Sequence, residues 1–384
     1  MTRQQSPAVA ASHQENGQDP HRSLHSEAGG LPGEHPGRSR HPLIKVAGLS
    51  WLEFEKPDLD RAERFGTDFG FTVADRTPDT LLLRGRWAAA ACLVVRRGPR
   101  PRFAGVTFSA AAREDLDRLA RGTGGTVTAH WGGHAVLLRD PSGFPVRVVH
   151  GMPELPALPE RGPLPLNFGS EPVRANATQR PARHPAEIQR LGHVVLGTTR
   201  FTAALDWYLD TLGLIVSDFL YLDGQRQRGP VMAFIRCDLD SMPTDHHTLA
   251  MVLQPRTEYV HSAYQLTDLD EVAASGEYLR ERGYRHAWGL GRHIQGSQIF
   301  DYWRDPDRAM FEHYADGDVF DSSMEPGWAP LSVSGLSQWG PRATAEFTGT
   351  KDPRVVVEAI KALREKDNEI DIAALRGLIK TMSS

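Results

Sequence analysis

The chain is poor in cysteine, with only Cys92 and Cys237 among 384 residues. One possible bridge cannot staple a chain of this length, and two thiols cannot supply a cysteine-type zinc site. The sequence therefore excludes both a disulfide scaffold and a thiolate metal centre. Any metal binding or proton transfer near neutral pH must depend on carboxylates and on the sixteen histidines.

The chain also lacks a long apolar run and a clear excess of charge of one sign. No stretch approaches the ~18–20 apolar residues that span a bilayer, and the N-terminus lacks the basic-then-apolar order of a secretory signal. Lysine and arginine number 44 against 48 acidic residues, which gives a net charge of −4. This balance provides no basic field for nucleic acid. We therefore expect a cytoplasmic protein that binds neither nucleic acid nor a membrane.

The length exceeds one ordinary domain of ~100–200 residues, and composition divides the chain into five parts. Residues 1–41 contain no aromatic residue and no hydrophobic period, which predicts a disordered tail. Eight prolines within residues 151–187 predict an extended linker. Two ordered units then remain, residues 42–150 and 188–316, and they are followed by a C-terminal extension over 317–384.

The two ordered units repeat one pattern of elements. In the second unit, hydrophobic periodicity predicts helices over Phe201–Leu212 and Asp268–Arg282, each preceded by one strand and followed by three. Each unit closes on an Asp-Pro turn, at Asp140 and at Asp305, that leads into an apolar strand. We therefore predict an α+β fold of four β-α-β-β-β modules, paired into two domains.

Three residues of the second unit are candidates for chemistry. His193 and His261 lie on the first strands of its two modules, and Glu312 lies on the last strand. If paired modules curve around a shared cleft, the three side chains converge. Two imidazoles and one carboxylate leave adjacent coordination positions open, which suits a non-haem Fe(II) that binds a substrate and dioxygen together. Spacing alone does not establish this site, because a strand histidine is more often a hydrogen-bonded core residue and a buried Glu can pair with an Arg.

Several segments resemble the type I extradiol catechol dioxygenases, a family of the vicinal oxygen chelate superfamily, which is built from β-α-β-β-β modules. The resemblance covers about residues 42–345 and is strongest in the second unit. Its segments are Leu191-Gly192-His193-Val194-Val195, Asp245-His246-His247-Thr248-Leu249-Ala250, Tyr259-Val260-His261, Gly291-Arg292-His293, Phe300-Asp301-Tyr302-Trp303 and Phe311-Glu312. By this resemblance His193, His261 and Glu312 are metal ligands, His247 is a second-sphere acid–base, and His293 and Tyr302 lie beside the bound catecholate and oxygen.

The resemblance implies an Fe(II)-dependent enzyme that cleaves the ring of a substituted catechol with O2, giving a hydroxymuconic semialdehyde-type product. Mn(II) could replace iron, because imidazole and carboxylate do not separate the two ions sharply. Two alternatives stay open: another metal-dependent enzyme of the superfamily, such as an isomerase or lyase, and a protein that binds an aromatic compound. The second-sphere set of His247, His293 and Tyr302 favours the dioxygenase over the first alternative. The intact metal-ligand triad argues against the second.

The first unit has no equivalent ligands, since Trp51 lies in the region of His193 and Arg147 in the position of Glu312. We expect it to be metal-free and to serve packing or assembly. His246 would face away from His247 if this segment were a strand, so we expect it to be structural or to lie at the rim of the cleft.

The C-terminal extension carries two further patterns. Residues 318–345 contain Phe320, Trp328 and Trp339 separated by proline and glycine, and could form either a lid over the cleft or a strap on the domain surface. Beyond them, apolar residues recur at helical spacing on either side of Asp367–Glu369. Such a stripe favours a contact between subunits of a homo-oligomer.

Overall fold

The structure is a computed structural model that describes residues 27–28, 30–332, 336–349, 354–365 and 367–383. The first unit contains two modules, β2 (Val46–Lys56), α1 (Leu59–Phe69), β3 (Thr72–Arg76), β4 (Thr80–Arg84) and β5 (Leu93–Arg97), then β6 (Arg102–Ala110), α2 (Arg113–Thr123), β7 (Val127–His130), β8 (Gly133–Arg139) and β9 (Pro145–His150). The second unit contains β10 (Arg190–Thr198), α3 (Phe201–Leu212), β11 (Leu214–Leu222), β12 (Met232–Cys237) and β14 (Leu249–Leu253), then β15 (Glu258–Gln265), α4 (Leu269–Glu281), β16 (Arg285–His293), β17 (Ile299–Arg304) and β18 (Met310–Ala315). The predicted α+β fold of four β-α-β-β-β modules is confirmed.

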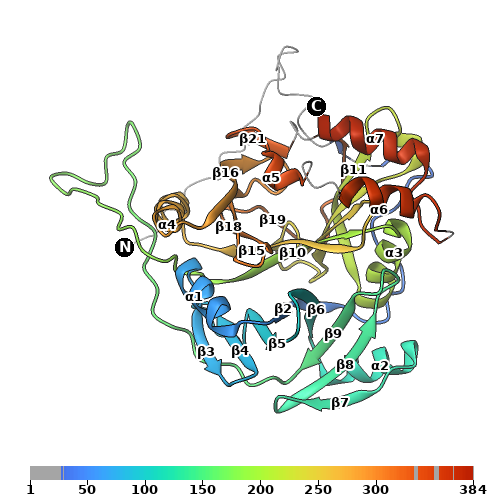
Figure 1. The fold of residues 1–384 in the computed structure, drawn as a ribbon, viewed down its shortest axis with the longest axis horizontal. Helices are drawn as coiled ribbons and strands as arrows, with labels where there is room; N and C mark the ends of the chain where they lie inside the picture. Colours follow the sequence, from blue (N-terminus) through green and yellow to red (C-terminus); the bar gives the residue numbers. More distant parts are fainter. Residues whose placement is uncertain (1–26, 29, 333–335, 350–353, 366, 384) are drawn as a thin grey trace, which may run out of the picture.

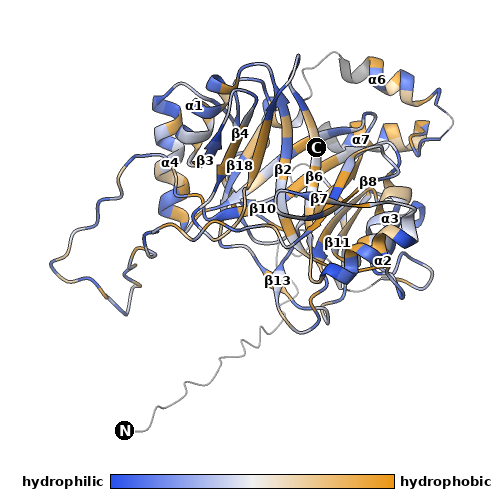
Figure 2. Cartoon of the chain, turned by 90° about the horizontal axis from the view of Figure 1, so that it is seen from below, coloured by the Kyte–Doolittle hydropathy of each residue, from blue (hydrophilic) through white to orange (hydrophobic). Residues whose placement is uncertain are grey.

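Each unit forms one continuous sheet in which the first strands of its two modules pair antiparallel at the centre. The strand order of the first sheet is β3-β4-β5-β2-β6-β9-β8-β7. The second has the order β1-β20-β11-β12-β14-β10-β15-β18-β17-β16-β21, with β1 (Glu27–Ala28), β20 (Gly327–Leu331) and β21 (Ser337–Trp339) added at its edges. In Figure 1 the first unit, blue to teal, lies below the second, green to orange, and α1 lies beside α4. Figure 2 shows the strands in the middle of the molecule as largely hydrophobic and the outer helix faces as mixed.

Aromatic side chains join the two units into one hydrophobic core. The Phe69 ring stacks on His313 of β18 with ring centroids 3.9 Å apart, and His313 donates a hydrogen bond from Nε2 to the Phe69 carbonyl oxygen at 2.7 Å. Burial lowers the pKa of His313 to about 4, so the ring is neutral in this contact. Phe311 packs edge-on against Phe65 and Phe69. The second sheet therefore packs against the first unit through β18, the last strand of its second module.

The N-terminal segment differs from the prediction. Residues 1–26 of the predicted tail lie outside the described residues, but residues 30–41 pack on the second unit. Glu34 pairs with Arg226 at 2.8 Å, His35 Nε2 contacts Asp206 at 2.8 Å, and the Gly37 carbonyl accepts from the Val216 N–H at 2.7 Å. The prediction of disorder is wrong for these residues. The composition of a segment indicates only how much apolar surface the segment itself can bury. Residues 30–41 are instead held by polar contacts to the folded second unit, which their composition does not indicate.

The linker, residues 151–187, is described throughout and contains no helix or regular strand. It runs along both units, because Arg84 donates to the Pro156 carbonyl at 2.7 Å and Arg161 pairs with Asp268 at 2.9 Å. Eight prolines account for its extended course, since proline cannot continue a helix or a central strand.

The C-terminal extension is built into the second unit. Strand β20 pairs in parallel with β11, and the fully buried Trp328 packs on Phe219, with ring centroids 4.6 Å apart. β19 (Val319–Phe320) pairs with β13 (Thr244–Asp245), and β21 pairs with β16. The part of residues 318–345 that the structure describes is therefore a strap along the sheet edges.

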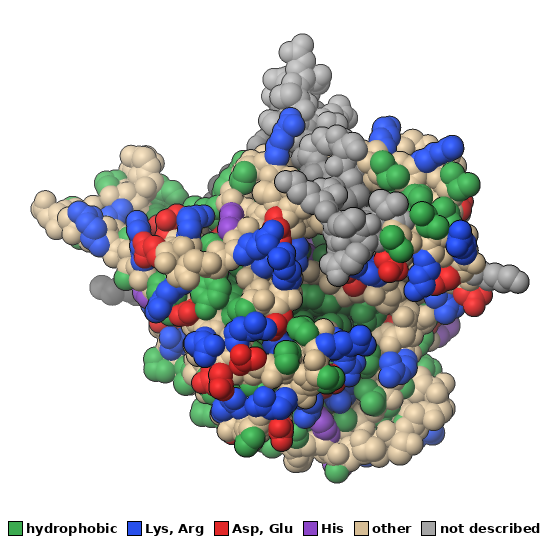
Figure 3. All heavy atoms as spheres, viewed as in Figure 1, with side chains coloured by type: hydrophobic (Ala, Val, Ile, Leu, Met, Phe, Trp, Pro, Cys, Tyr) green, Lys and Arg blue, Asp and Glu red, His purple; other side chains and the backbone are tan. Residues whose placement is uncertain are grey.

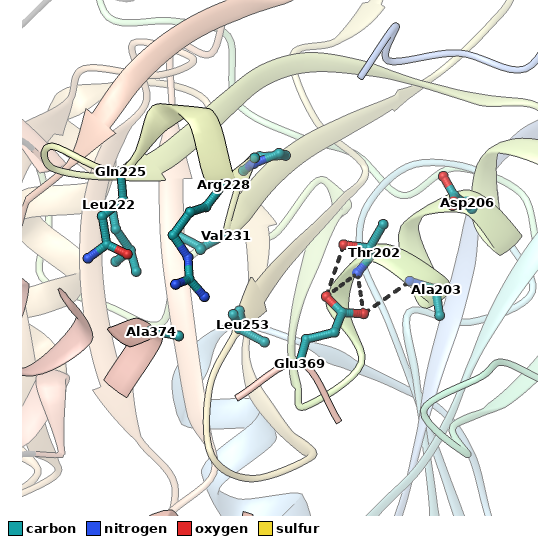
Figure 4. Close-up of a pocket in the computed structure, with 12 residues that line it drawn as sticks. Thr202, Ala203, Asp206, Leu222, Gln225, Arg228, Val231, Leu253, Glu369 and Ala374 are labelled. Atoms are coloured by element: carbon teal, nitrogen blue, oxygen red, sulfur yellow. Dashed lines mark hydrogen bonds between the residues drawn. The ribbon is translucent and has the colours of Figure 1, made fainter. Parts of the chain in front are cut away.

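The end of the extension caps a helix of the second unit. Helix α3 has no capping side chain at its own N-terminus, and the Glu369 carboxylate accepts hydrogen bonds from the N–H groups of Thr202, at 2.9 Å, and Ala203, at 3.3 Å (Figure 4). A carboxylate at a helix N-terminus satisfies unpaired donors and complements the helix dipole.

The helices that follow α5 (Ala345–Thr348) are α6 (Arg354–Ala362) and α7 (Ile372–Ser383), as the helical spacing predicts. Several of their large apolar side chains stay exposed, Ile360 by 49%, Ile372 by 60% and Ile379 by 56%, whereas Leu378 packs against the core. A homo-oligomer contact at this surface stays a prediction. On the face shown in Figure 3, basic and acidic side chains are interspersed. Among the described residues, no helix is both long and apolar enough to cross a membrane.

Lys56, at the end of β2, is buried between two carboxylates of the second unit. Its Nζ contacts Asp305 and lies 3.1 Å from Asp307, and the lysine and Asp305 side chains are 4% and 1% exposed. Lys56→Met should lower the free energy of unfolding by about 3–5 kcal/mol, because it leaves the buried Asp305 carboxylate without its cation, whereas Asp307 keeps its contact with Arg61. Urea denaturation of both proteins measures this difference. Lys361→Met, which removes an exposed lysine, should leave the midpoint unchanged. Equal midpoints for the Lys56 variant and the unmodified chain would contradict a stabilising role for this contact.

Candidate metal centre and active site

Strand register brings the three candidate metal ligands to one face of the second sheet. His193 on β10 stands opposite Ala263 on β15, and Ala263 stands beside Glu312 on β18. His261 precedes Ala263 by two residues, so its side chain leaves β15 on the same face. The small side chain of Ala263 lies between the three larger ones and leaves room for them to converge.

The three side chains meet at a buried point. The Nε2 atoms of His193 and His261 each lie 3.2 Å from Oε2 of Glu312, and the ligand-type atoms are all within 4.8 Å of one another. The residues are 2%, 7% and 0% exposed, respectively. Among the described residues, this is the one group of three or more His, Cys, Asp or Glu side chains close enough to hold a metal ion.

Charge at this point is set by burial and by the imidazoles. Burial would raise the pKa of Glu312, but contacts with His193, His261 and His293 outweigh it and hold the pKa well below the ordinary value of a glutamate. Burial lowers the pKa of His261. These shifts favour an ionised Glu312 and a neutral His261, which are the protonation states that a divalent cation requires of its ligands.

Orphaned polar atoms at the same point fit a cation. Neither carboxylate oxygen of Glu312 receives a hydrogen bond of good geometry from the described residues, although both are buried. A buried anion without donors is costly unless a positive charge compensates it. The donor set contains no sulfur, and its three ligands leave coordination positions open on the metal. It therefore suits iron or manganese.

His247 lies directly beside the triad. Its ring centroid is 4.0 Å from that of His193, and the residue is 3% exposed. Burial lowers the pKa of His247 well below the ordinary value, and the neighbouring imidazoles of His193 and His246 lower it further. A neutral imidazole in this position can accept a proton from a bound molecule.

Tyr302 and His293 form a hydrogen-bonded pair on the other side of Glu312. Tyr302 stands opposite Glu312 in the β17–β18 register, and its hydroxyl lies 2.8 Å from His293 Nε2. Burial, followed by the nearby Glu312, raises the pKa of Tyr302 well above its ordinary value. The phenol therefore keeps its proton and can donate it in a hydrogen bond.

The strap determines how His293 takes part in this pair. His293 Nδ1 lies 2.9 Å from the Leu336 carbonyl oxygen, which can only accept, so Nδ1 carries the proton. When the ring carries only this proton, Nε2 is an acceptor for the Tyr302 hydroxyl. The sequence analysis missed this contact, because a backbone carbonyl 43 residues away leaves no side-chain signal.

His246 does not face away from His247 or lie at the rim, as the strand pattern predicted, because residues 246–248 lie outside strand β14; the alternative of a structural residue agrees with its burial. Its Nδ1 is 3.0 Å from His247 Nδ1, and its Nε2 is 2.6 Å from Asp218 on β11. His246 thus faces His247. Nothing in the sequence marked Asp218, since Ser217-Asp218 sits within an apolar strand without a recognisable motif.

The equivalent point of the first unit is filled by packing. Trp51 stands opposite Thr107, which stands beside Arg147, in the same register as His193, Ala263 and Glu312. Arg147 pairs with Glu53, and the Trp51 indole N–H donates to Glu53 at 3.2 Å. These side chains place an ion pair and an indole where the second unit brings its imidazoles and carboxylate together.

Comparison with known proteins identifies the family. Residues 190–313 match the model of the Glyoxalase/Bleomycin resistance protein/Dioxygenase superfamily. The chain is 32% identical to Metapyrocatechase 2 of Cupriavidus necator over 339 residues, covering 86% of this chain and 98% of that protein. It is 24% identical to the iron-dependent extradiol dioxygenase of Rhodococcus jostii over 318 residues, covering 77% and 97%.

Solved structures share the fold. Homoprotocatechuate 2,3-dioxygenase from Brevibacterium fuscum, in complex with 3,4-dihydroxyphenylacetate, superposes with a TM-score of 0.65 at 18% identity, covering 82% of this chain and 95% of that one. The Mn(II)-bound glyoxalase from Novosphingobium aromaticivorans gives a TM-score of 0.64 at 20% identity, covering 79% and 94%. With the identity to Metapyrocatechase 2 over most of both chains, these comparisons show that the chain belongs to the extradiol catechol dioxygenases of this superfamily and is an oxidoreductase.

Proposed function

We propose that this protein cleaves the ring of a substituted catechol with O2 at an Fe(II) ion held by His193, His261 and Glu312, giving a hydroxymuconic semialdehyde-type product. The observation that carries the proposal is the convergence of this triad with His247 on one side and the Tyr302–His293 pair on the other. The names of two relatives, a metapyrocatechase and an iron-dependent extradiol dioxygenase, support the reaction and the metal. Mn(II) is the alternative ion, since the ligand set accepts both.

The bound metal would supply a place where the two catechol oxygens and dioxygen meet and exchange electron density. The residues around it divide the remaining work. His247, held neutral by burial, accepts a catechol proton at its free ring nitrogen and can return it later. Tyr302 keeps its proton and donates a hydrogen bond. His293 is held by the Leu336 carbonyl on one edge and accepts from Tyr302 on the other.

A buried aromatic cluster lies beside the site. Trp288, Phe300 and Tyr302 belong to this cluster, and Trp288 stacks on Tyr302 at a centroid separation of 5.7 Å. An aromatic, apolar neighbourhood of this kind supports an aromatic substrate. The site and the names of the relatives support a catechol as the substrate class, and we propose no second function.

Anaerobic loading with Fe(II) followed by a panel of catechols tests the proposed reaction. We expect oxygen uptake with at least one substituted catechol and a new near-visible absorption band from the ring-opened product. Protein loaded with Zn(II), which has no redox chemistry, should consume no oxygen. Absence of oxygen uptake with every catechol, in protein that retains stoichiometric iron, would reject extradiol cleavage.

His261→Ala tests the proposed metal ligands. Removing one of three ligands should lower the bound iron at least tenfold, measured by elemental analysis after anaerobic loading and gel filtration. His286→Ala is the matched control, because His286 is a strand histidine that contacts Asp301 instead of the triad. Iron content equal to that of the unmodified chain would remove His261 from the ligand set.

His247→Phe tests the acid–base role. The ring volume is kept and no proposed ligand is removed, so we expect normal iron content and a kcat about 10²- to 10⁴-fold lower. His134→Phe, which changes an exposed histidine of the first unit, serves as the control. An unchanged kcat in the His247 variant would show that this imidazole does not move a proton in the reaction.

A further inference from the structure

A buried chain of three polar side chains leads from β11 to the triad. The Asp218 carboxylate lies 2.6 Å from His246 Nε2, and His246 Nδ1 lies 3.0 Å from His247 Nδ1. Asp218, His246 and His247 are 7%, 1% and 3% exposed. The His247 ring then packs against His193, one of the proposed metal ligands. This hydrogen-bonded series of side chains therefore connects a carboxylate outside the site with the imidazole beside the metal position.

With Asp218 ionised and His246 neutral, the chemistry of the atoms gives the direction of the two hydrogen bonds. An ionised carboxylate can only accept, so His246 Nε2 must carry a proton and donate it to Asp218. In a neutral imidazole the other nitrogen, Nδ1 of His246, is then an acceptor. His247 must therefore donate from its own Nδ1, which leaves Nε2 of His247 without a proton.

From this geometry we infer that Asp218 and His246 are positioning residues that hold His247 in the tautomer with a free Nε2 lone pair. They act on the reaction only through His247. The kinetic part of the inference rests on the proposed function, because it concerns proton transfer from a catechol. The tautomer itself is a property of the protein alone.

The surroundings of His246 prevent its ring from turning. Its backbone N–H donates to the Asp318 carbonyl at 2.9 Å, and its carbonyl accepts from Ser217 Oγ at 2.6 Å. The rings of Phe234 and Phe320 pack against it, with centroids 5.6 and 5.3 Å away. On a further side the backbone of Gly296 comes so close that a Cβ there would lie 3.0 Å from Nδ1. A rotated ring would lose both hydrogen bonds and would have to displace these neighbours, so the orientation is held by packing as well as by Asp218.

The strand that carries Asp218 is itself held in place. Arg236, which is fully buried, donates to the Val216 carbonyl at 3.0 Å and to Ser217 Oγ at 2.8 Å. Ser217 in turn donates to His246. The β11 segment and His246 are thus connected by backbone and side-chain contacts on both sides of the Asp218 carboxylate. A carboxylate held this rigidly is suited to orient a ring, as outer partners of functional histidines commonly do.

The first experiment reads the tautomer without substrate. The metal-free full-length chain is labelled with ¹⁵N-histidine, and long-range ¹H–¹⁵N correlation spectra distinguish a protonated ring nitrogen from a bare one. The His247→Phe variant identifies the His247 signals by their loss. We expect His247 to have a protonated Nδ1 and a bare Nε2. A protonated Nε2 in the unmodified chain would overturn the inference whether or not the enzyme cleaves catechols.

Substitutions of Asp218 test the cause. Asp218→Asn offers an amide N–H that can donate to His246 and so reverse the direction of both hydrogen bonds. Asp218→Ala removes the acceptor altogether. We expect either change to raise the population of His247 protonated at Nε2. With Fe(II) and a catechol, kcat should fall about 10- to 100-fold while KM and iron content stay within about twofold. Asp218→Glu, which restores a carboxylate, should recover part of kcat.

Asp301→Asn is the matched control. Asp301 is also a buried carboxylate 2.6 Å from a histidine Nε2, that of His286, but this pair does not touch His247. We expect its kcat and the His247 tautomer to match the unmodified chain. If both Asp218→Asn and Asp218→Ala keep the original tautomer and kcat, the positioning role is rejected. If the tautomer changes as expected while the unmodified chain cleaves no catechol, the positioning role stands and the proposed function fails.

Discussion

The site depends on one constraint, the hydrogen-bond register of three adjacent strands. Because β10, β15 and β18 pair around Ala263, three side chains that are far apart in sequence must leave the sheet on one face. A slip of one residue in either pairing would turn a ligand to the opposite face. The buried contacts between the two units hold β18 in this register, since Phe311 and His313 pack on the first unit and alternate with Glu312. Residues on the two faces of one strand thus serve assembly and chemistry separately.

Much of this arrangement could be predicted from the sequence, because it follows from local patterns. The helix expected over Phe201–Leu212 has those bounds, and the one expected over Asp268–Arg282 is Leu269–Glu281. The repeat of β-α-β-β-β order follows from hydrophobic periodicity and turn residues. Of the candidates, His193 and His261 lie on the corresponding first strands of two modules, and Glu312 lies on the last strand of the second. Residues at matching places in a repeated unit are brought together by the pairing of the units, which is why spacing was informative here.

The contacts that could not be predicted are those that join distant segments through groups without a motif. His246 was expected to face away from His247 because the segment was treated as a strand, yet the chain is irregular there and the two rings meet. Leu336 contacts His293 through its backbone carbonyl, so its residue type says nothing about this hydrogen bond. Residues 30–41 were expected to be disordered because they are polar, but their partners Arg226 and Asp206 lie on a surface that forms only after folding.

The hydrogen bond from His293 to the Leu336 carbonyl has a consequence for the limits of the functional unit. Residues 188–316 make up the complete two-module fold, but Leu336 lies beyond them and Glu369, which caps α3, lies further still. A minimal catalyst cut at the module boundary would keep every proposed metal ligand and lose the group that selects the tautomer of His293. In this protein the two-module fold and the complete site therefore need different lengths of chain, and any transplantation of the site onto another scaffold would have to carry the strap with it.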